Sequence, residues 1–117
     1  MTELTHVNPG ARMSGAVVYN GVAYLAGQVA LGAPGASVAD QTRNILDLLD
    51  DTMAKAGTDK SRMLAASIWL SDIATFDEMN AVWDAWVADV TAPARATVEA
   101  KLAAPQFTVE IALTVAA

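Results

Sequence analysis

The sequence contains no cysteine, a single histidine and few charged residues. Without cysteine, disulfide bonds, thiolate metal sites and a cysteine nucleophile are excluded. His6 alone gives little support to a histidine-based triad or a multi-histidine metal site, so we expect no metal and no cofactor. Charged residues make up only 17% of the chain, with a net charge of −6. An acidic chain without clustered Lys and Arg is a poor candidate for binding nucleic acid, because phosphate neutralisation requires such clusters.

Long hydrophobic runs and targeting signals are also missing. No run of about 18 apolar residues exists, and the first part of the chain lacks the basic start and apolar core of a signal peptide. We therefore expect a cytoplasmic protein with no membrane partner. The glycine-containing segment 31–36 is neither a P-loop nor a dinucleotide-binding fingerprint. A length of 117 residues predicts a single domain, 1–117.

The segments that are present begin with strands. Residues 4–7 predict a short strand that ends at a turn. Residues 16–19 and 22–26 flank Asn20-Gly21. Asn-Gly between two strand-like runs is a strong signal for a type I′ hairpin, because both residues tolerate positive φ. We therefore predict a hairpin over residues 16–26.

Two segments predict amphipathic helices. The first starts at Ser37, with Asp40 in the capping-box position, and stops at Gly57. The second starts at a further capping box formed by Thr75 and Glu78. Its apolar face is aromatic, which is typical of a core face and less often of a ligand cage. That face carries Phe76, Met79, Trp83 and Trp86.

Three segments predict the remaining strands. Residues 63–70 form a nearly continuous apolar run, which indicates a strand buried on both faces. Residues 95–102 and 107–115 alternate between polar and apolar side chains, separated by the short link 103–106. This spacing predicts an antiparallel hairpin. In such a hairpin the polar sets share one face, which would place Arg95 and Glu110 on the same face of one sheet, while the register between them is not fixed by the sequence.

Arg95 and Glu110 allow two interpretations. On the wet face of a hairpin such charges are most often solvated or weakly paired. Pro93 favours a functional interpretation, because it fixes the chain entering the strand and so positions Arg95. A guanidinium fork grips a carboxylate through two parallel hydrogen bonds, and a glutamate beside it can act on a water molecule.

The order of elements predicts an α+β fold, a single mixed sheet of about six strands with two helices on one face. Two helices cannot cover both faces of such a sheet. The apolar run 63–70 and the apolar excess of the composition indicate that the other face is also dry. The simplest cover is another copy of the chain.

Four motifs carry a resemblance to a known family. They are Pro93–Glu99, Tyr24–Gln28, Asn80-Ala81 ahead of Trp83–Trp86, and Val109–Ile111. In this order and spacing they resemble the Rid family, the reactive intermediate (enamine/imine) deaminases, also called the YjgF family. The resemblance implies a chorismate-mutase-like fold that assembles as a homotrimer with ligand clefts between subunits.

The resemblance also implies roles for single residues. Arg95 would hold the carboxylate of a 2-imino acid, and Glu110 would act on water and on the leaving nitrogen. The backbone at Gly27 and the side chain of Asn80 would form further walls of the substrate site.

The pocket lining departs from that of the best-studied Rid deaminases. Met13 stands where those proteins carry a tyrosine, Thr97 where they carry a cysteine, and Ala26 where they carry a serine. Three functions therefore stay open. The first is hydrolysis of small 2-imino acids to 2-oxo acids and ammonia. The second is non-catalytic binding or sensing of a small carboxylate by a trimer. The ribonuclease activity attributed to some relatives fits the acidic charge least.

Overall fold

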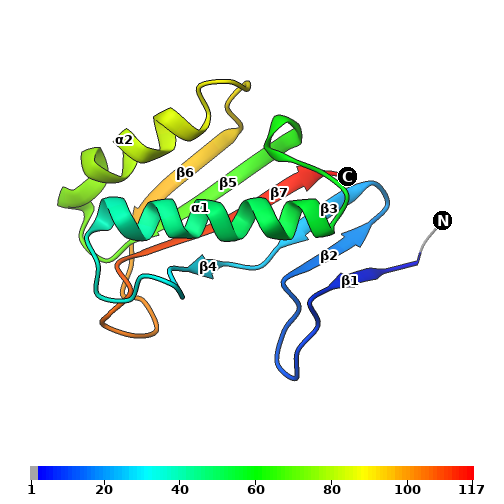
Figure 1. The fold of residues 1–117 in the computed structure, drawn as a ribbon, viewed down its shortest axis with the longest axis horizontal. Coiled ribbons are helices and arrows are strands. Elements are labelled where there is room, and N and C mark those ends of the chain that lie inside the picture. The colour runs from blue at the N-terminus through cyan, green and yellow to red at the C-terminus, as the bar shows by residue number, and fades with distance from the viewer. Residues whose placement is uncertain (1–2) are drawn as a thin grey trace.

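The strands form one mixed sheet, and both helices lie on the same face of it (Figure 1). This computed structural model describes residues 3–117. The strand order is β1-β2-β3-β7-β5-β6, and β4 also pairs with β7. The predicted α+β architecture is confirmed, with seven strands rather than about six. Its elements are β1 (Thr5–Val7), β2 (Ala16–Tyr19), β3 (Val22–Leu25), β4 (Gln28–Val29), α1 (Val38–Lys55), η1 (Lys60–Arg62), β5 (Met63–Leu70), η2 (Ile73–Thr75), α2 (Phe76–Trp86), β6 (Ala94–Glu99) and β7 (Val109–Ala116).

The β2–β3 hairpin forms where the sequence predicts it. Tyr19 pairs with Val22 across the turn. The two turn residues, Asn20 and Gly21, both have positive φ, at 53° and 79°. These values are those that a type I′ turn requires, which explains the choice of Asn-Gly.

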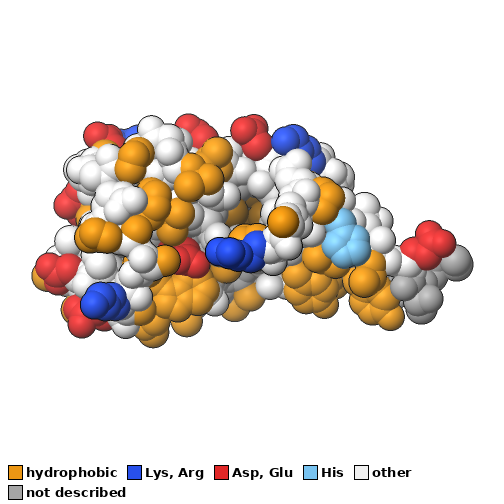
Figure 2. Space-filling model, turned by 90° about the horizontal axis from the view of Figure 1, so that it is seen from below, with side chains coloured by type: hydrophobic (Ala, Val, Ile, Leu, Met, Phe, Trp, Pro, Cys, Tyr) orange, Lys and Arg blue, Asp and Glu red, His pale blue; other side chains and the backbone are white. Residues whose placement is uncertain are grey.

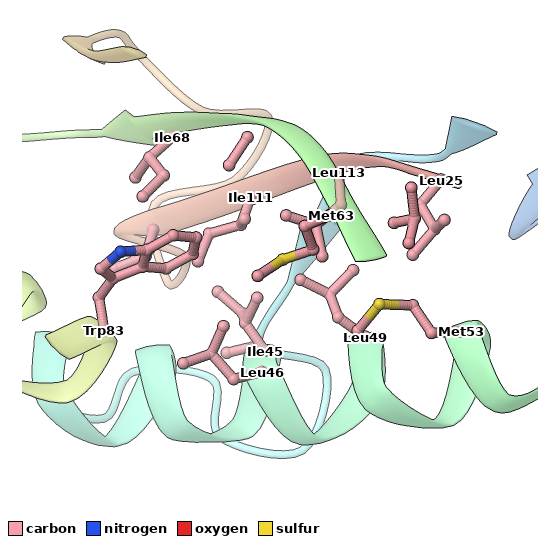
Figure 3. Close-up of a cluster of buried hydrophobic side chains, with 14 of the residues drawn as sticks. Leu25, Ile45, Leu46, Leu49, Met53, Met63, Ile68, Trp83, Ile111 and Leu113 are labelled. Carbon is pink, nitrogen blue, oxygen red and sulfur yellow. The ribbon is translucent and has the colours of Figure 1, made fainter. Parts of the chain in front are cut away.

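Helix α1 lies along the sheet and buries one face against it (Figure 3). Ser37 caps its first turn, because the Oγ atom accepts a hydrogen bond from the backbone N–H of Asp40 at 3.1 Å. Gly57, with φ of 81°, follows its last turn. The residues that α1 contributes to the hydrophobic core are Val38, Ile45, Leu46, Leu49 and Met53.

The start of α2 differs from the prediction. Thr75 does not cap the helix with its side chain; its Oγ1 donates to the carbonyl of Asp72 at 2.6 Å. The predicted capping box is wrong, because η2 runs directly into α2. Glu78 instead reaches the other helix, where its Oε2 accepts a hydrogen bond from Ala39 N at 2.9 Å. A carboxylate at this position also complements the positive end of the α1 dipole.

The last two strands do not form the predicted hairpin. β6 pairs with β5 in parallel, and β7 pairs with β5 antiparallel, so β5 lies between them. The α2 crossover delivers β6 to the outer side of β5, in parallel with it. The connection 100–108 then passes across the end of β5. Ala100 N donates to Leu70 O at 2.9 Å, and Ser71 N donates to Thr108 O at 3.1 Å.

The face of the sheet opposite the helices is uncovered within one chain. Along β5, side chains alternate between buried and more exposed, so this strand is buried on one face only. On the open face Tyr24 of β3 and Val98 of β6 are 51% and 50% exposed. Figure 2 shows hydrophobic side chains gathered along the lower edge of the molecule, away from the helices. Burial of β5 on both faces therefore stays a prediction that needs a second copy. Over residues 3–117 no helix is both long and apolar enough to span a bilayer.

Candidate functional site

Arg95 is held against helix α2 by neutral groups. Its Nη1 donates a hydrogen bond of 2.7 Å to Asn80 Oδ1. The guanidinium carbon lies 5.4 Å from the centre of the Trp83 ring and 5.7 Å from that of Phe76. Both distances fall within the range of a cation–π interaction. Arg95 itself is half-buried at the start of β6, on the helix-covered face.

Arg95 has no anionic partner among residues 3–117. The ion pairs of the described chain are formed by two other cations, Arg43 with Asp40 and Lys60 with Asp89. The sequence has 13 acidic residues, yet none of those described neutralises this half-buried guanidinium. A buried or partly buried charge is normally paired. The arrangement therefore leaves a cation whose fork is available to an anion from outside the chain.

Glu110 lies on β7, with Val29 of β4 on one side and Trp69 of β5 on the other. It is half-buried. Its carboxylate lies against the backbone of Gly27, at the place that a Cβ atom would occupy. Any side chain at this position would overlap Glu110 Oε2. The missing side chain of Gly27 therefore gives the carboxylate its position.

Arg95 and Glu110 point to opposite faces of the sheet. Arg95 shares a row with Ala66 and Leu113, which are 3% and 2% exposed on the helix-covered face. Glu110 shares a row with Trp69, one residue out of phase with the buried positions of β7. The prediction that the two charges share a face is wrong. It assumed that β6 and β7 are neighbours whose polar side chains share a face. Both strands instead pair with β5, where Arg95 lies opposite Ala66 and Glu110 opposite Trp69, two positions that point to different faces.

The other predicted site residues are spread over the molecule. Thr97 follows Arg95 on the same face of β6, and its Oγ1 is buried with no hydrogen-bond partner within residues 3–117. Asn80 contacts Arg95 directly. Met13 lies in the β1–β2 connection, away from β6 (Figure 1), and is 57% exposed. One chain thus brings together Arg95, Asn80 and Thr97 on one side, and Gly27 with Glu110 on the other.

Two hollows in the surface lie away from these charges. A cavity of about 810 Å³ is formed by the connection 100–107, with Ser71 and Glu99 at its margin. A second, of about 510 Å³, lies between the helices beside Lys60 and Trp86. Neither is lined by Arg95 or Glu110.

The sequence did not indicate two features around these charges. The aromatic face of α2 was interpreted mainly as a core face, although Phe76 and Trp83 also face Arg95. Gln41 is fully buried and joins the loop before α1 to the connection before β7. A glutamine on the apolar stripe of α1 is the only signal that could have revealed it.

Comparison with known proteins gives consistent matches along the chain. A family model described as endoribonuclease L-PSP matches residues 4–117. A RutC family protein from Haemophilus ducreyi is 43% identical over 113 residues, covering 97% of this chain and 96% of that protein. The RutC family protein YoaB from Escherichia coli K12 is 37% identical over 116 residues, covering 97% of each.

Solved structures agree with this assignment. A crystal structure of a member of the YjgF protein family from Neisseria meningitidis superposes with a TM-score of 0.93 at 41% identity, covering 98% of this chain and 95% of that one. The resemblance drawn from the four sequence motifs is thereby confirmed. The chain belongs to the YjgF/RutC family, to which the Rid proteins also belong.

Proposed function

We propose that this protein is an enamine/imine deaminase that hydrolyses small 2-imino acids to 2-oxo acids and ammonia. The observation that carries this proposal is the half-buried Arg95, which has no carboxylate partner within residues 3–117. A guanidinium has five N–H donors. Asn80 accepts from Nη1, and the remaining donors can grip a substrate carboxylate in a bidentate pair.

We further propose that the reaction takes place in a cleft between subunits of a homotrimer. Arg95 and Glu110 lie on opposite faces of the sheet, so one chain does not present both to a small ligand. A copy lying flat on the open face would not reach Arg95, so Glu110 of a neighbouring copy would have to approach it past the edge strand β6. The exposed apolar side chains of that face, Tyr24 and Val98 among them, support such a contact.

The hydrolysis needs few groups. Glu110 accepts a proton from water while the water oxygen attacks the C=N carbon, and it passes that proton to the nitrogen, which gives a carbinolamine. Glu110 then takes the hydroxyl proton and delivers it to the amino nitrogen as the C–N bond breaks, so that a C=O bond forms and ammonia leaves. Arg95 holds the carboxylate throughout. The backbone at Gly27 and the side chains of Asn80, Thr97 and Met13 complete the proposed substrate site, in keeping with the roles that family resemblance implies.

A second candidate function is non-catalytic binding or sensing of a small carboxylate by the same trimer. The pocket lining favours it, because Met13 and Thr97 supply neither the phenol nor the thiol of the best-studied deaminases. The family model's description names an endoribonuclease. We rank ribonuclease activity last, since a net charge of −6 offers little to a phosphate backbone.

The experiment compares carboxylate binding and imine hydrolysis in the same variants. Benzoate binding is measured by calorimetry, and ammonia release by supplying imines from an amino-acid oxidase. Arg95→Ala should weaken binding roughly 10- to 150-fold, the equivalent of a charge-assisted hydrogen bond of about 1.5–3 kcal/mol. Arg95→Lys should also weaken it, because a point charge does not replace a fork. Arg43→Ala, which alters an exposed arginine on α1, is the matched control.

Glu110→Gln separates catalysis from binding. It keeps the shape of the side chain and removes the base, so benzoate affinity should stay near that of wild type. Turnover should fall about 100-fold or more. No ammonia release by wild type or by Met13→Tyr would favour the binding function. Unchanged affinity in Arg95→Ala, or a stable monomer in sedimentation at micromolar concentration, would contradict the proposed site.

A further inference from the structure

We infer that Trp83 is a positioning residue for Arg95, and that its indole ring sets the plane of the guanidinium fork offered to the substrate carboxylate. This inference rests on the proposed function, because it assigns a role to the neighbours of the same arginine. Trp83 touches no substrate in this scheme. It acts through Arg95, and what it supplies is orientation rather than chemistry.

Trp83 is itself firmly fixed. It is 4% exposed, and Figure 3 shows its ring directed from α2 toward the sheet. The ring also packs against Trp86, with centroids 5.4 Å apart and planes inclined at 51°. A ring held in this way restricts the orientation of a side chain packed against it, because closely packed interiors leave little room for movement.

Three residues of α2 surround the guanidinium by virtue of their spacing. Phe76, Asn80 and Trp83 stand at i, i+4 and i+7, which places them on one face of a helix. Asn80 fixes one nitrogen of Arg95, and the two rings lie within 6 Å of its central carbon. One hydrogen bond alone would allow the fork to rotate about it. A ring on the same helix face removes that freedom.

The chemistry of these neighbours suits an anion site. A carboxylate partner would also fix Arg95, but it would neutralise the charge and compete with the substrate. An aromatic face attracts a cation through its quadrupole and leaves the net charge in place. Trp83 can therefore orient Arg95 without occupying the donors that the ligand needs.

Trp86 provides a matched control on the same helix. Its ring lies under Lys60, 5.3 Å from Nζ, and contacts Trp83. Within residues 3–117 the cation–π partners of Arg95 are Phe76 and Trp83, and Trp86 is not among them. Removal of either indole costs packing, but Trp86→Leu leaves the Trp83 ring beside Arg95. It should therefore affect carboxylate binding much less than Trp83→Leu does.

The test measures benzoate affinity by calorimetry in the full-length protein, with circular dichroism and sedimentation as checks on fold and assembly. Trp83→Leu should weaken binding roughly 5- to 30-fold, in line with a partly desolvated cation–π contact. Trp83→Phe keeps a π face and should restore most of the affinity. Trp86→Leu, which removes packing around Trp83 but no ring beside Arg95, should weaken binding much less than Trp83→Leu. In an Arg95→Ala background, Trp83→Leu should cause no further loss, since the effect passes through Arg95.

Phe76→Leu keeps the test decisive if Trp83→Leu does not fold, because Phe76 is 37% exposed and tolerates replacement more readily. It should weaken benzoate binding by a few-fold. If Trp83→Leu or, failing that, Phe76→Leu binds as wild type while Arg95→Ala loses binding, the positioning role is refuted and the proposed function stands. Wild-type affinity in Arg95→Ala would overturn both.

Discussion

The side chain of Gln41 joins the loop before α1 to the connection before β7, and its replacement tests how much this junction contributes to stability. Its side chain is fully buried. Its Nε2 donates to Ala36 O at 3.0 Å and to Gln106 O at 3.1 Å, and its Oε1 accepts from Thr108 N at 2.9 Å. One amide thus joins α1, the loop before it and the connection that leads into β7.

Gln41→Met keeps the length of the side chain and removes all three hydrogen bonds. Gln106 O retains a bond from Gly35 N, whereas Thr108 N loses the partner that Gln41 gave it. At about 1 kcal/mol net for each bond, and more for a buried group left unpaired, the variant should lose about 3 kcal/mol of unfolding free energy. For a chain of 117 residues this corresponds to a decrease in Tm of about 12 °C.

Urea denaturation at fixed protein concentration measures this loss, because assembly makes apparent stability concentration-dependent. Gln28→Met is the matched control. The Gln28 side chain bonds only the carbonyl of its neighbour Val29, at 2.9 Å, so its replacement should cost less than about 1 kcal/mol. A Gln41→Met midpoint equal to that of Gln28→Met would refute the argument that Gln41 joins the two loops.

Three further predictions concern other parts of the molecule. Gly27→Ala should displace the Glu110 carboxylate and lower imine turnover roughly tenfold or more, while benzoate affinity and the urea midpoint change little. Ser37→Ala should cost about 1 kcal/mol in urea denaturation, because α1 loses its N-cap. Burial raises the pKa of Asp50 above 3.8, so the contribution of this carboxyl to stability should fall as pH rises from 3.8 through its folded pKa. Asp50→Asn, which keeps an acceptor for Trp86, should abolish that loss in midpoints measured across this range.

Local patterns in the sequence predicted most of the elements. The Asn20-Gly21 turn, the Ser37 cap, the Gly57 stop and the strand Met63–Leu70 all appear where the pattern placed them. Each depends on residues close together in the chain. The capping box at Thr75 failed for a reason that is not local, because Glu78 bonds the other helix.

The members of the proposed site stay a prediction, and the expected geometry of Arg95 and Glu110 is wrong. Arg95 and Glu110 were chosen from motifs, but their relation depends on which strand lies between β6 and β7. Alternation along a strand says which side chains share a face, and it does not say which strands are neighbours. The α2 crossover places β6 beyond β5 in the sheet, and the residues of β6 and β7 do not indicate this strand order.

Arg95 and Glu110 are held in position by different elements of the molecule. Arg95 depends on α2, through Asn80 and Trp83. Glu110 depends on Gly27. These supports lie on different elements, so changes in α2 should act on carboxylate affinity, and changes at Gly27 should act on turnover. If the proposed trimer forms, each copy supplies both halves of the site to different neighbours, and a defect in either half should lower activity in every one of its clefts.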